Sequence, residues 1–386
     1  MIGETRDILS ELIAFDTTSR NSNLKLIEWV EAFLASHGVA STRVYSPEGD
    51  KANLWATIGP RDVPGYVLSG HTDTVPVDEQ VWASDPFTLT ERDGRFYGRG
   101  TADMKGFLAC VLSRVPAMAA APLARPLHIA FSHDEEIGLI GVRYLLAEVG
   151  RLAPTPPIAC FVGEPTNMQV VVAHKGRYVY RATVTGKACH SSRAPDGVNA
   201  IDYAAELVLK IRDIARRLIA DGMTDDLYDV PFSTAHTGLI SGGTAVNIVP
   251  EHCSFDFEFR PLPGIDHEPW LAEVVAFARD ELEPRMQAVD PHAGIRIELD
   301  NGVPGFDTAV DADAVTIAKR LAGRNDHAKV AYGTEAGLFV WQGGIPSVVI
   351  GPGSIAQAHA EDEFIEIAEL DKCLGFLDRL IAHCAA

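Results

Sequence analysis

Short, mainly apolar runs alternate along most of the chain with longer segments in which apolar residues recur every three or four positions. The apolar runs cover residues 66–68, 127–132, 158–162 and 347–350. Helical periodicity covers residues 5–15, 23–37, 106–118 and 138–149. Continuous apolar runs are typical of strands buried on both faces, so their alternation with helices predicts a mostly parallel α/β sheet.

The middle of the chain shows a different order of elements. Strands are expected at residues 178–185, 233–240, 245–260 and 294–299, and helices at residues 197–220 and 269–283. This β-α-β-β-α-β order is the ferredoxin-like one. Because the α/β pattern then returns, we interpret residues 177–300 as an inserted domain. It would interrupt a single α/β domain made of residues 1–176 and 301–386.

Polar residues able to bind a metal stand at the ends of the apolar runs or in glycine-rich segments near them. They are His71, Asp73, Asp103, Glu135, Glu136, Glu164 and His359. Ligands of open α/β sheets lie beyond the carboxyl ends of the strands, so these side chains are expected at one edge of the sheet. Imidazole and carboxylate donors without paired thiols suit Zn²⁺, Co²⁺ or Mn²⁺.

Each of these motifs alone has a simpler interpretation, a turn at a strand end in which Asp and Gly serve only the backbone geometry. The repetition at four strand ends favours the metal site. His71 followed two residues later by Asp73 is also a common arrangement for a metal-binding histidine, because the carboxylate holds the ring N–H and fixes the tautomer.

Composition narrows the class of protein. The chain has 386 residues, enough for two domains, with 47% hydrophobic and 22% charged residues. A formal net charge of −20 argues against a nucleic-acid or acidic-membrane partner, because phosphate repulsion is not offset. Six cysteines without a CxxC pair, an N-terminus that is amphipathic rather than signal-like and no membrane-length apolar stretch indicate a cytoplasmic protein.

The motifs occur in an order that resembles the di-metal aminoacylase and carboxypeptidase family, peptidase family M20. HTDTVP, GRGTADMKG, DEEIG, GEPT, HKGR and a late histidine follow one another over essentially the whole chain. The resemblance implies a zinc-peptidase-like catalytic domain, residues 1–176 and 301–386, with an inserted ferredoxin-like lid at residues 177–300. It also implies a homodimer formed through the lid, and a cis peptide between Asp103 and Met104.

The resemblance also implies roles for single residues. His71 would bind one metal ion, Asp103 would bridge two, Glu136 and His359 would complete one site, and Glu164 the other. The expected ions are two Zn²⁺, for which Co²⁺ can substitute. Glu135 would be the general base that activates the attacking water, and Asp73 would orient His71.

Three residues of the predicted lid are candidates for contacts with the substrate. His190 resembles the lid histidine that stabilises the oxyanion, often across a dimer interface; without the resemblance it is an ordinary polar residue. Arg260 resembles the arginine that pairs with the substrate α-carboxylate, and its alternative is a salt bridge at a strand end. Asn247 is a weaker candidate for substrate binding, and Glu335 is considered as a partner for a cationic substrate side chain.

The expected activity is hydrolysis of a small-molecule N-acyl amino acid. The residue sequences of the motifs most resemble those of the family branch that converts N-acetyl-L-ornithine to L-ornithine and acetate in arginine biosynthesis. Alternatives within the same chemistry are a succinyl-diaminopimelate desuccinylase, an N-acetylcitrulline or N-formylglutamate deacylase, and a metallo-carboxypeptidase. A metal-dependent binding protein that has lost catalysis is a further alternative, against which the intact Glu135 argues.

Overall fold

The computed structural model describes residues 2–385 and divides into two compact units. Unit 1 comprises the described residues up to Ala173 together with Phe306–Lys329 and the residues from Thr334 onward. Unit 2 comprises His174–Gly305 and Val330–Gly333. Each unit has its own sheet and its own buried side chains, and each is described by itself.

Unit 1 is built on a nine-stranded sheet in the order β1-β2-β6-β3-β7-β15-β8-β13, with β14 paired to β8. Strands β6, β3, β7 and β15 run parallel, and the flanking pairs β1-β2, β2-β6 and β15-β8 are antiparallel. The strands are β1 Ser41–Tyr45, β2 Ala52–Ile58, β3 Tyr66–His71, β6 Leu127–Ser132, β7 Ala159–Val162, β8 Val171–His174, β13 Phe306–Asp307, β14 Ala328–Val330 and β15 Ser347–Val349.

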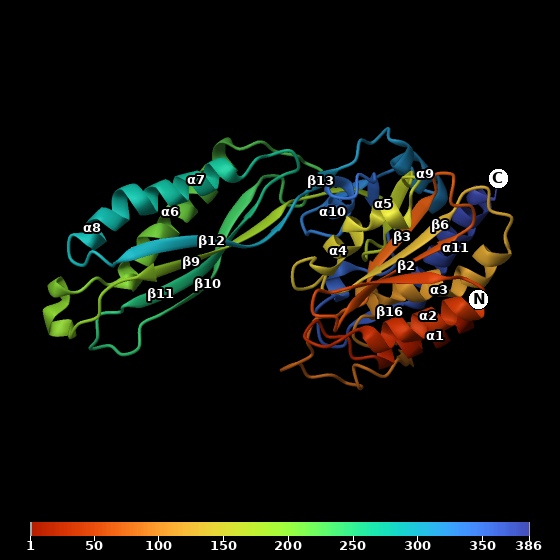
Figure 1. Cartoon of the computed structure of the whole chain (residues 1–386), viewed down its shortest axis with the longest axis horizontal. Coiled ribbons are helices and arrows are strands. Elements are labelled where there is room, and N and C mark those ends of the chain that lie inside the picture. Colours follow the sequence, from red (N-terminus) through yellow and green to blue (C-terminus); the bar gives the residue numbers. More distant parts are fainter. Residues whose placement is uncertain (1, 386) are drawn as a thin grey trace. The chain divides into compact units, whose positions relative to one another are not determined.

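Helices cover both faces of this sheet (Figure 1). Helix α3 packs against β3, α1 and α11, while α4 packs against β2 and α10. The helices of unit 1 are α1 Ile2–Ala14, α2 Leu24–Ser36, α3 Gly106–Ala120, α4 Gly141–Ala147, α5 Val149–Leu152, α9 Asp313–Ala322, α10 Ala336–Trp341 and α11 Ile367–Cys384. With both faces covered, the central strands are buried along their length, which explains their continuous apolar sequences.

Unit 1 also contains a small three-stranded sheet, which brings two loops together. Its order is β16-β5-β4, with β4 Thr90–Arg92, β5 Arg95–Tyr97 and β16 Phe364–Glu366. The β4-β5 hairpin turns at Asp93 and Gly94, a dipeptide that favours such turns because both residues adopt a positive φ. Strand β16 pairs with β5, which brings the segment after the short helix η4 (Ile355–Gln357) beside the turn η1 (Thr101–Lys105).

Unit 2 is an antiparallel four-stranded sheet in the order β10-β11-β9-β12 (Figure 1). Its strands are β9 Arg177–Thr185, β10 Thr234–Gly242, β11 His252–Arg260 and β12 Gly294–Val303. Its helical segments are η2 Ser191–Asp196, α6 Ala200–Asp221, α7 Glu268–Phe277, η3 Ala278–Leu282 and α8 Glu283–Gln287. Helix α6 packs on β9, β10 and β11 over a core that includes Phe255, Phe257 and Phe259.

The predicted fold class is confirmed: a mostly parallel α/β sheet and a separate antiparallel sheet with the β-α-β-β-α-β order. The predicted extent of one strand is wrong. The strand expected over residues 245–260 begins only at His252, because Pro250 has no N–H to donate to a ladder. The short strands β8, β13 and β16 were not predicted, since two to four residues carry little periodicity.

Within residues 2–385, none of the helices combines the length and the apolar character that crossing a membrane requires.

A chain of hydrogen bonds ends on a buried histidine in β6. Trp55 donates its indole N–H to the Thr57 hydroxyl at 3.1 Å, and Thr57 Oγ1 lies 3.0 Å from His128 Nδ1. The Thr57 hydroxyl thus links the indole of Trp55 to Nδ1 of His128. Burial, with a smaller contribution from Arg61, lowers the pKa of His128 to about 4.

We predict that the free energy of unfolding falls between pH 6.5 and pH 4 partly through His128. In that range the unfolded chain binds a proton at this residue and the folded chain does not, a contribution of at most about 3 kcal/mol. Urea titrations of the wild type and of His128→Asn, whose amide oxygen can still accept from Thr57, measure it. The variant should lose less stability on acidification, and parallel pH profiles would contradict the prediction.

Candidate metal centre

Three parallel strands end at the same edge of the sheet in unit 1. Strand β3 ends at His71, which pairs with Ser132 at the end of β6, and β7 is followed by Glu164. The backbone at the end of β7 is tight, because a Cβ on Gly163 would lie 2.1 Å from the Phe107 ring. Glycine at this position therefore lets α3 approach the strand end that carries Glu164.

Asp103 lies between the two candidate imidazoles. Its side chain is 6% exposed, its Oδ1 lies 2.9 Å from His71 Nε2, and its Oδ2 lies 3.3 Å from His359 Nε2. The two oxygens thus face different histidines, as a bridging carboxylate requires. The peptide bond between Asp103 and Met104 is cis, which confirms that prediction.

The remaining predicted ligands lie beside the same two histidines. Glu136 Oε2 is 3.0 Å from His359 Nε2, and Glu164 Oε1 is 3.8 Å from His71 Nε2. In the part of the chain that the structure describes, two sets have ligand atoms within 4.8 Å of one another: His71 with Glu135 and Glu164, and His71 with Asp103 and Glu136. The structure therefore brings all five predicted ligands together, with Glu135 among them. His359 is the exposed member, with a side chain 53% accessible.

Asp73 ties the end of β3 to the two adjacent glutamates. Its carboxylate accepts the backbone N–H of Glu135 at 3.1 Å and that of Glu136 at 3.3 Å, and the Ser19 hydroxyl at 2.7 Å. The nearest acceptor for His71 Nδ1 is the main-chain oxygen of Asp73 at 2.9 Å, and the carboxylate lies at 3.6 Å. A proton held on Nδ1 leaves the Nε2 lone pair free to bind a metal.

The carboxylates of the cluster repel one another. Burial raises the pKa of both Glu135 and Glu164 well above the ordinary value, and burial together with Asp103 raises that of Glu136 to about 7. Burial also acts to raise the pKa of Asp103, but hydrogen bonds with His359 and His71 outweigh it and lower the pKa. Hydrogen bonds to Asp103 and Glu136 raise the pKa of His359 to about 10.

These residues fit a divalent metal centre. Among residues 2–385, Glu136 Oε1 is buried without a hydrogen-bond partner, which is costly for a carboxylate oxygen unless a cation or donor satisfies it. The neighbouring donors are imidazole nitrogens and carboxylate oxygens, the ligand types of Zn²⁺, Co²⁺ and Mn²⁺. The carboxyl groups would hold the ion as anions, since it would offset their mutual repulsion.

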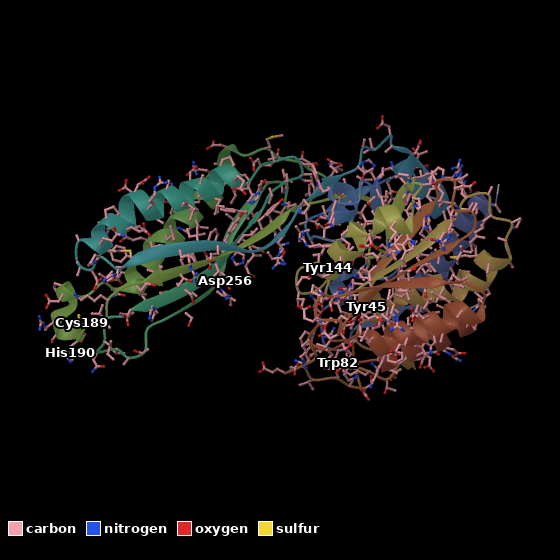
Figure 2. All side chains as sticks on the ribbon, viewed as in Figure 1. Tyr45, Trp82, Tyr144, Cys189, His190 and Asp256 are labelled. Atoms are coloured by element: carbon pink, nitrogen blue, oxygen red, sulfur yellow. The ribbon has the colours of Figure 1, made fainter. Side chains whose placement is uncertain are left out.

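The candidates for substrate contact lie in unit 2. His190 is exposed beside η2, where Figure 2 labels it. Its Nδ1 accepts the backbone N–H of Ser192 at 3.2 Å, so the neutral ring carries its proton on the exposed Nε2. Asn247 is exposed, and its main-chain oxygen accepts the N–H of Ser191 at 3.0 Å, so the two candidate loops are neighbours.

Arg260 forms the strand-end ion pair that was its alternative interpretation. Its Nε lies 2.7 Å from Glu258 Oε1, and Arg177 approaches the other oxygen of Glu258 at 3.1 Å. One carboxylate therefore serves two guanidinium groups, which leaves donors of Arg260 for a further anion.

Glu335 is not a contact for a substrate side chain. It is 1% exposed and accepts hydrogen bonds from the hydroxyls of Ser69 and Ser132, at the ends of β3 and β6. A carboxylate so enclosed braces two strand ends and has no open face for a ligand. The pairing joins residues more than 200 positions apart, so local sequence carries no signal for it.

The chain belongs to peptidase family M20/M25/M40, whose sequence profile it matches over residues 67–383. This confirms the resemblance stated from the motifs and makes the chain a metallohydrolase that acts on small-molecule amides.

Two relatives and one solved structure are similar to this chain over nearly its whole length. The chain is 36% identical over 96% of its length to "Acetylornithine deacetylase" of Photorhabdus laumondii subsp. laumondii, of which it covers 93%. It is 37% identical over 97% of its length to the protein of that name in Pasteurella multocida, of which it covers 96%. The crystal structure of aminopeptidase PepT from Bacillus cereus matches with a TM-score of 0.77, 22% identity and coverage of 100% and 99%, which supports the fold.

We predict that Asp73→Asn lowers the free energy of unfolding of the metal-free protein by about 1–3 kcal/mol. The new amide N–H₂ would face N–H and O–H donors that the carboxylate now accepts. Urea unfolding measures the change. The control is Asp78→Asn, which alters a carboxylate that is 54% exposed and forms an ion pair with Arg20. An equal loss in both variants would contradict the role of Asp73.

Proposed function

We propose that this protein is a di-metal deacylase that hydrolyses N-acetyl-L-ornithine to L-ornithine and acetate. The observation that carries the proposal is identity of 36–37% across 96–97% of the chain to proteins named acetylornithine deacetylase. The complete donor set supports it, because His71, Asp103, Glu136, Glu164 and His359 all converge at one edge of the sheet. We propose a cytoplasmic location, which the six unpaired cysteines support.

His71, Asp103 and Glu164 would hold one Zn²⁺, and Asp103, Glu136 and His359 the other, with Co²⁺ as a substitute. Bound ions of this kind polarise the acyl oxygen and make water a stronger nucleophile. Asp103 would serve both sites through its two oxygens, which already face different imidazoles. Asp73 would hold the tautomer of His71 and the backbone of both glutamates.

Glu135 would be the general base. It would take one proton from the attacking water and deliver it to the amine nitrogen as the C–N bond breaks, so that the protons balance. Burial and the neighbouring Glu136 raise the pKa of Glu135, while His71 opposes the shift. A raised pKa makes this carboxylate a stronger proton acceptor, as a general base requires.

Unit 2 would supply the contacts with the rest of the substrate. The exposed Nε2–H of His190 would donate to the oxygen that becomes negative as water attacks. The guanidinium of Arg260 would pair with the substrate α-carboxylate, and Asn247 would contribute a hydrogen bond.

We propose a homodimer formed through unit 2, in which the partner subunit's His190 completes the reaction site. Strand β10 is an edge of its sheet and exposes Leu239 (67% accessible) and Ile240 (56%). An exposed apolar edge strand is prone to pair with another chain, and a second copy satisfies both the unpaired backbone and the apolar side chains.

The substrate is tested on the metal-reconstituted protein. N-acetylornithine, succinyl-diaminopimelate, N-acetylcitrulline and N-formylglutamate are compared by kcat/KM, with a chelated sample as the blank. N-acetylornithine should give the highest value, and Zn²⁺ or Co²⁺ should restore activity to the chelated protein. A higher value on another substrate would reassign the enzyme within the same chemistry.

We predict that Glu135→Gln lowers kcat about 10²- to 10⁴-fold while the protein still binds two metal ions. The amide has nearly the same shape but cannot accept the proton from water. The surface variant Glu148→Gln, which loses only an exposed pair with Arg151, should keep wild-type kcat. Full hydrolysis by Glu135→Gln, or loss of a metal ion from it, would assign Glu135 another role.

We also predict complementation between two inactive variants, His190→Ala and Glu135→Gln, joined in one dimer by co-expression with different affinity tags. If the partner subunit's His190 acts on each site, this heterodimer has one intact site and about half the wild-type activity per dimer. Recovery of background activity alone would show that His190 acts within its own chain, and failure to isolate a heterodimer would contradict the dimer.

A further inference from the structure

Glu363 is a buried carboxylate to which the proposed chemistry gives no role. Its side chain is 1% exposed. Its Oε1 accepts the backbone N–H of Ala102 at 2.9 Å and that of Asp103 at 3.1 Å. Its Oε2 accepts the N–H of Gly100 at 3.0 Å and a guanidinium N–H of Arg99 at 2.7 Å. Four donors therefore converge on one anion, and one of them belongs to the proposed bridging ligand.

Arg99 connects this anion to the loop of His359. It is itself 1% exposed, and its Nη1 also donates to the Ala360 main-chain oxygen at 3.2 Å. Its Nη2 donates to Gln80 Oε1 at 2.6 Å, and Gln80 Nε2 donates to the His359 main-chain oxygen at 3.1 Å. The ring of Trp82, labelled in Figure 2, lies 5.1 Å from the guanidinium carbon of Arg99.

The two residues between Ala360 and Glu363 hold the loop on the same neighbouring segment. Glu361 accepts the backbone N–H of Val81 at 3.1 Å, and Asp362 accepts that of Ala83 at 2.8 Å. The segment from His359 to Glu363 is thus held by hydrogen bonds, although the imidazole itself is exposed.

We propose that Glu363 and Arg99 are a positioning pair that sets the distance between Asp103 and His359, and so the geometry of the metal ion these two residues share. The inference rests on the proposed metal-dependent function. Neither residue touches the ion or the substrate. Their effect passes through the backbone N–H of Asp103 on one side and the main-chain oxygens of the His359 loop on the other.

The substitution Glu363→Gln tests this because the amide matches the carboxylate in shape but not in hydrogen bonding. Each carboxylate oxygen accepts two donors, so the amide nitrogen must face two of them in either orientation. The oxygen is best kept toward the charged Arg99. The nitrogen then faces the N–H groups of Ala102 and Asp103, and the backbone of the bridging ligand loses its support.

The measurement is a Co²⁺ titration of the metal-free, full-length protein, followed by the visible absorption of the bound ion. The wild type should bind two equivalents. Glu363→Gln should bind one of the two at least tenfold more weakly, with an altered absorption, because outer hydrogen-bond partners of metal ligands contribute on that scale. Gln80→Ala, a milder change at a partly exposed residue, should weaken the same ion about two- to tenfold.

Two controls separate positioning from a general loss of stability. Glu366→Gln makes the same chemical change three residues later, on a carboxylate 50% exposed and 3.5 Å from Arg95, and should leave both Co²⁺ affinities unchanged. Val315→Ala truncates a fully buried side chain in α9 and lowers stability away from the loop, yet should keep the wild-type absorption.

Wild-type Co²⁺ affinity and absorption in both Glu363→Gln and Gln80→Ala would overturn the positioning role, as would an equal loss in Val315→Ala. A wild type that binds no Co²⁺ would instead overturn the proposed function. If Glu363→Gln does not fold, the result for Gln80→Ala decides.

Discussion

Four acidic side chains lie close together beside two imidazoles. The surrounding structure of unit 1 must hold these carboxylates together against their mutual repulsion. Asp103, Glu135 and Glu164 are buried, and the side chain of Glu136 is nearly so. Burial raises the pKa values of the three glutamates, and repulsion from the neighbouring carboxylates, which is strong in a poorly polarisable interior, raises them further. A divalent cation relieves the repulsion, but the backbone must hold the ligands before the ion arrives.

Three carboxylates other than the proposed ligands and base hold the backbone around the cluster. Asp73 receives the amides of Glu135 and Glu136, Glu335 braces the ends of β3 and β6, and Glu363 receives the amide of Asp103. In each case a second carboxylate fixes main chain or strand ends. Asp73 and Glu335 act at or directly after the ends of strands in the sheet. Glu363 acts where the ligands stand in loops, which have no strand-to-strand hydrogen bonds to hold them.

Unit 2 offers chemistry of a different kind. His190 and Asn247 are exposed on adjacent loops, and Arg260 stands at the end of β11 with a shared ion-pair partner. Neutral hydrogen-bond donors and a guanidinium suit recognition of acyl oxygen and carboxylate groups, while the buried carboxylates of unit 1 suit metal ions and proton transfer. The proposed function therefore assigns substrate recognition to residues of unit 2, and metal binding and proton transfer to residues of unit 1.

The sequence by itself determined the fold class, the family and the metal-ligand candidates, because buried strands leave continuous apolar runs and each ligand stands at the end of one or in a glycine-rich motif. It could not show where β11 begins, nor the main-chain oxygen of Asp73 as the nearest partner of His71. It also could not separate Glu335 and Glu363 from solvated acids. Their partners lie hundreds of residues away, and only tertiary packing decides which carboxylate is enclosed and which donors reach it.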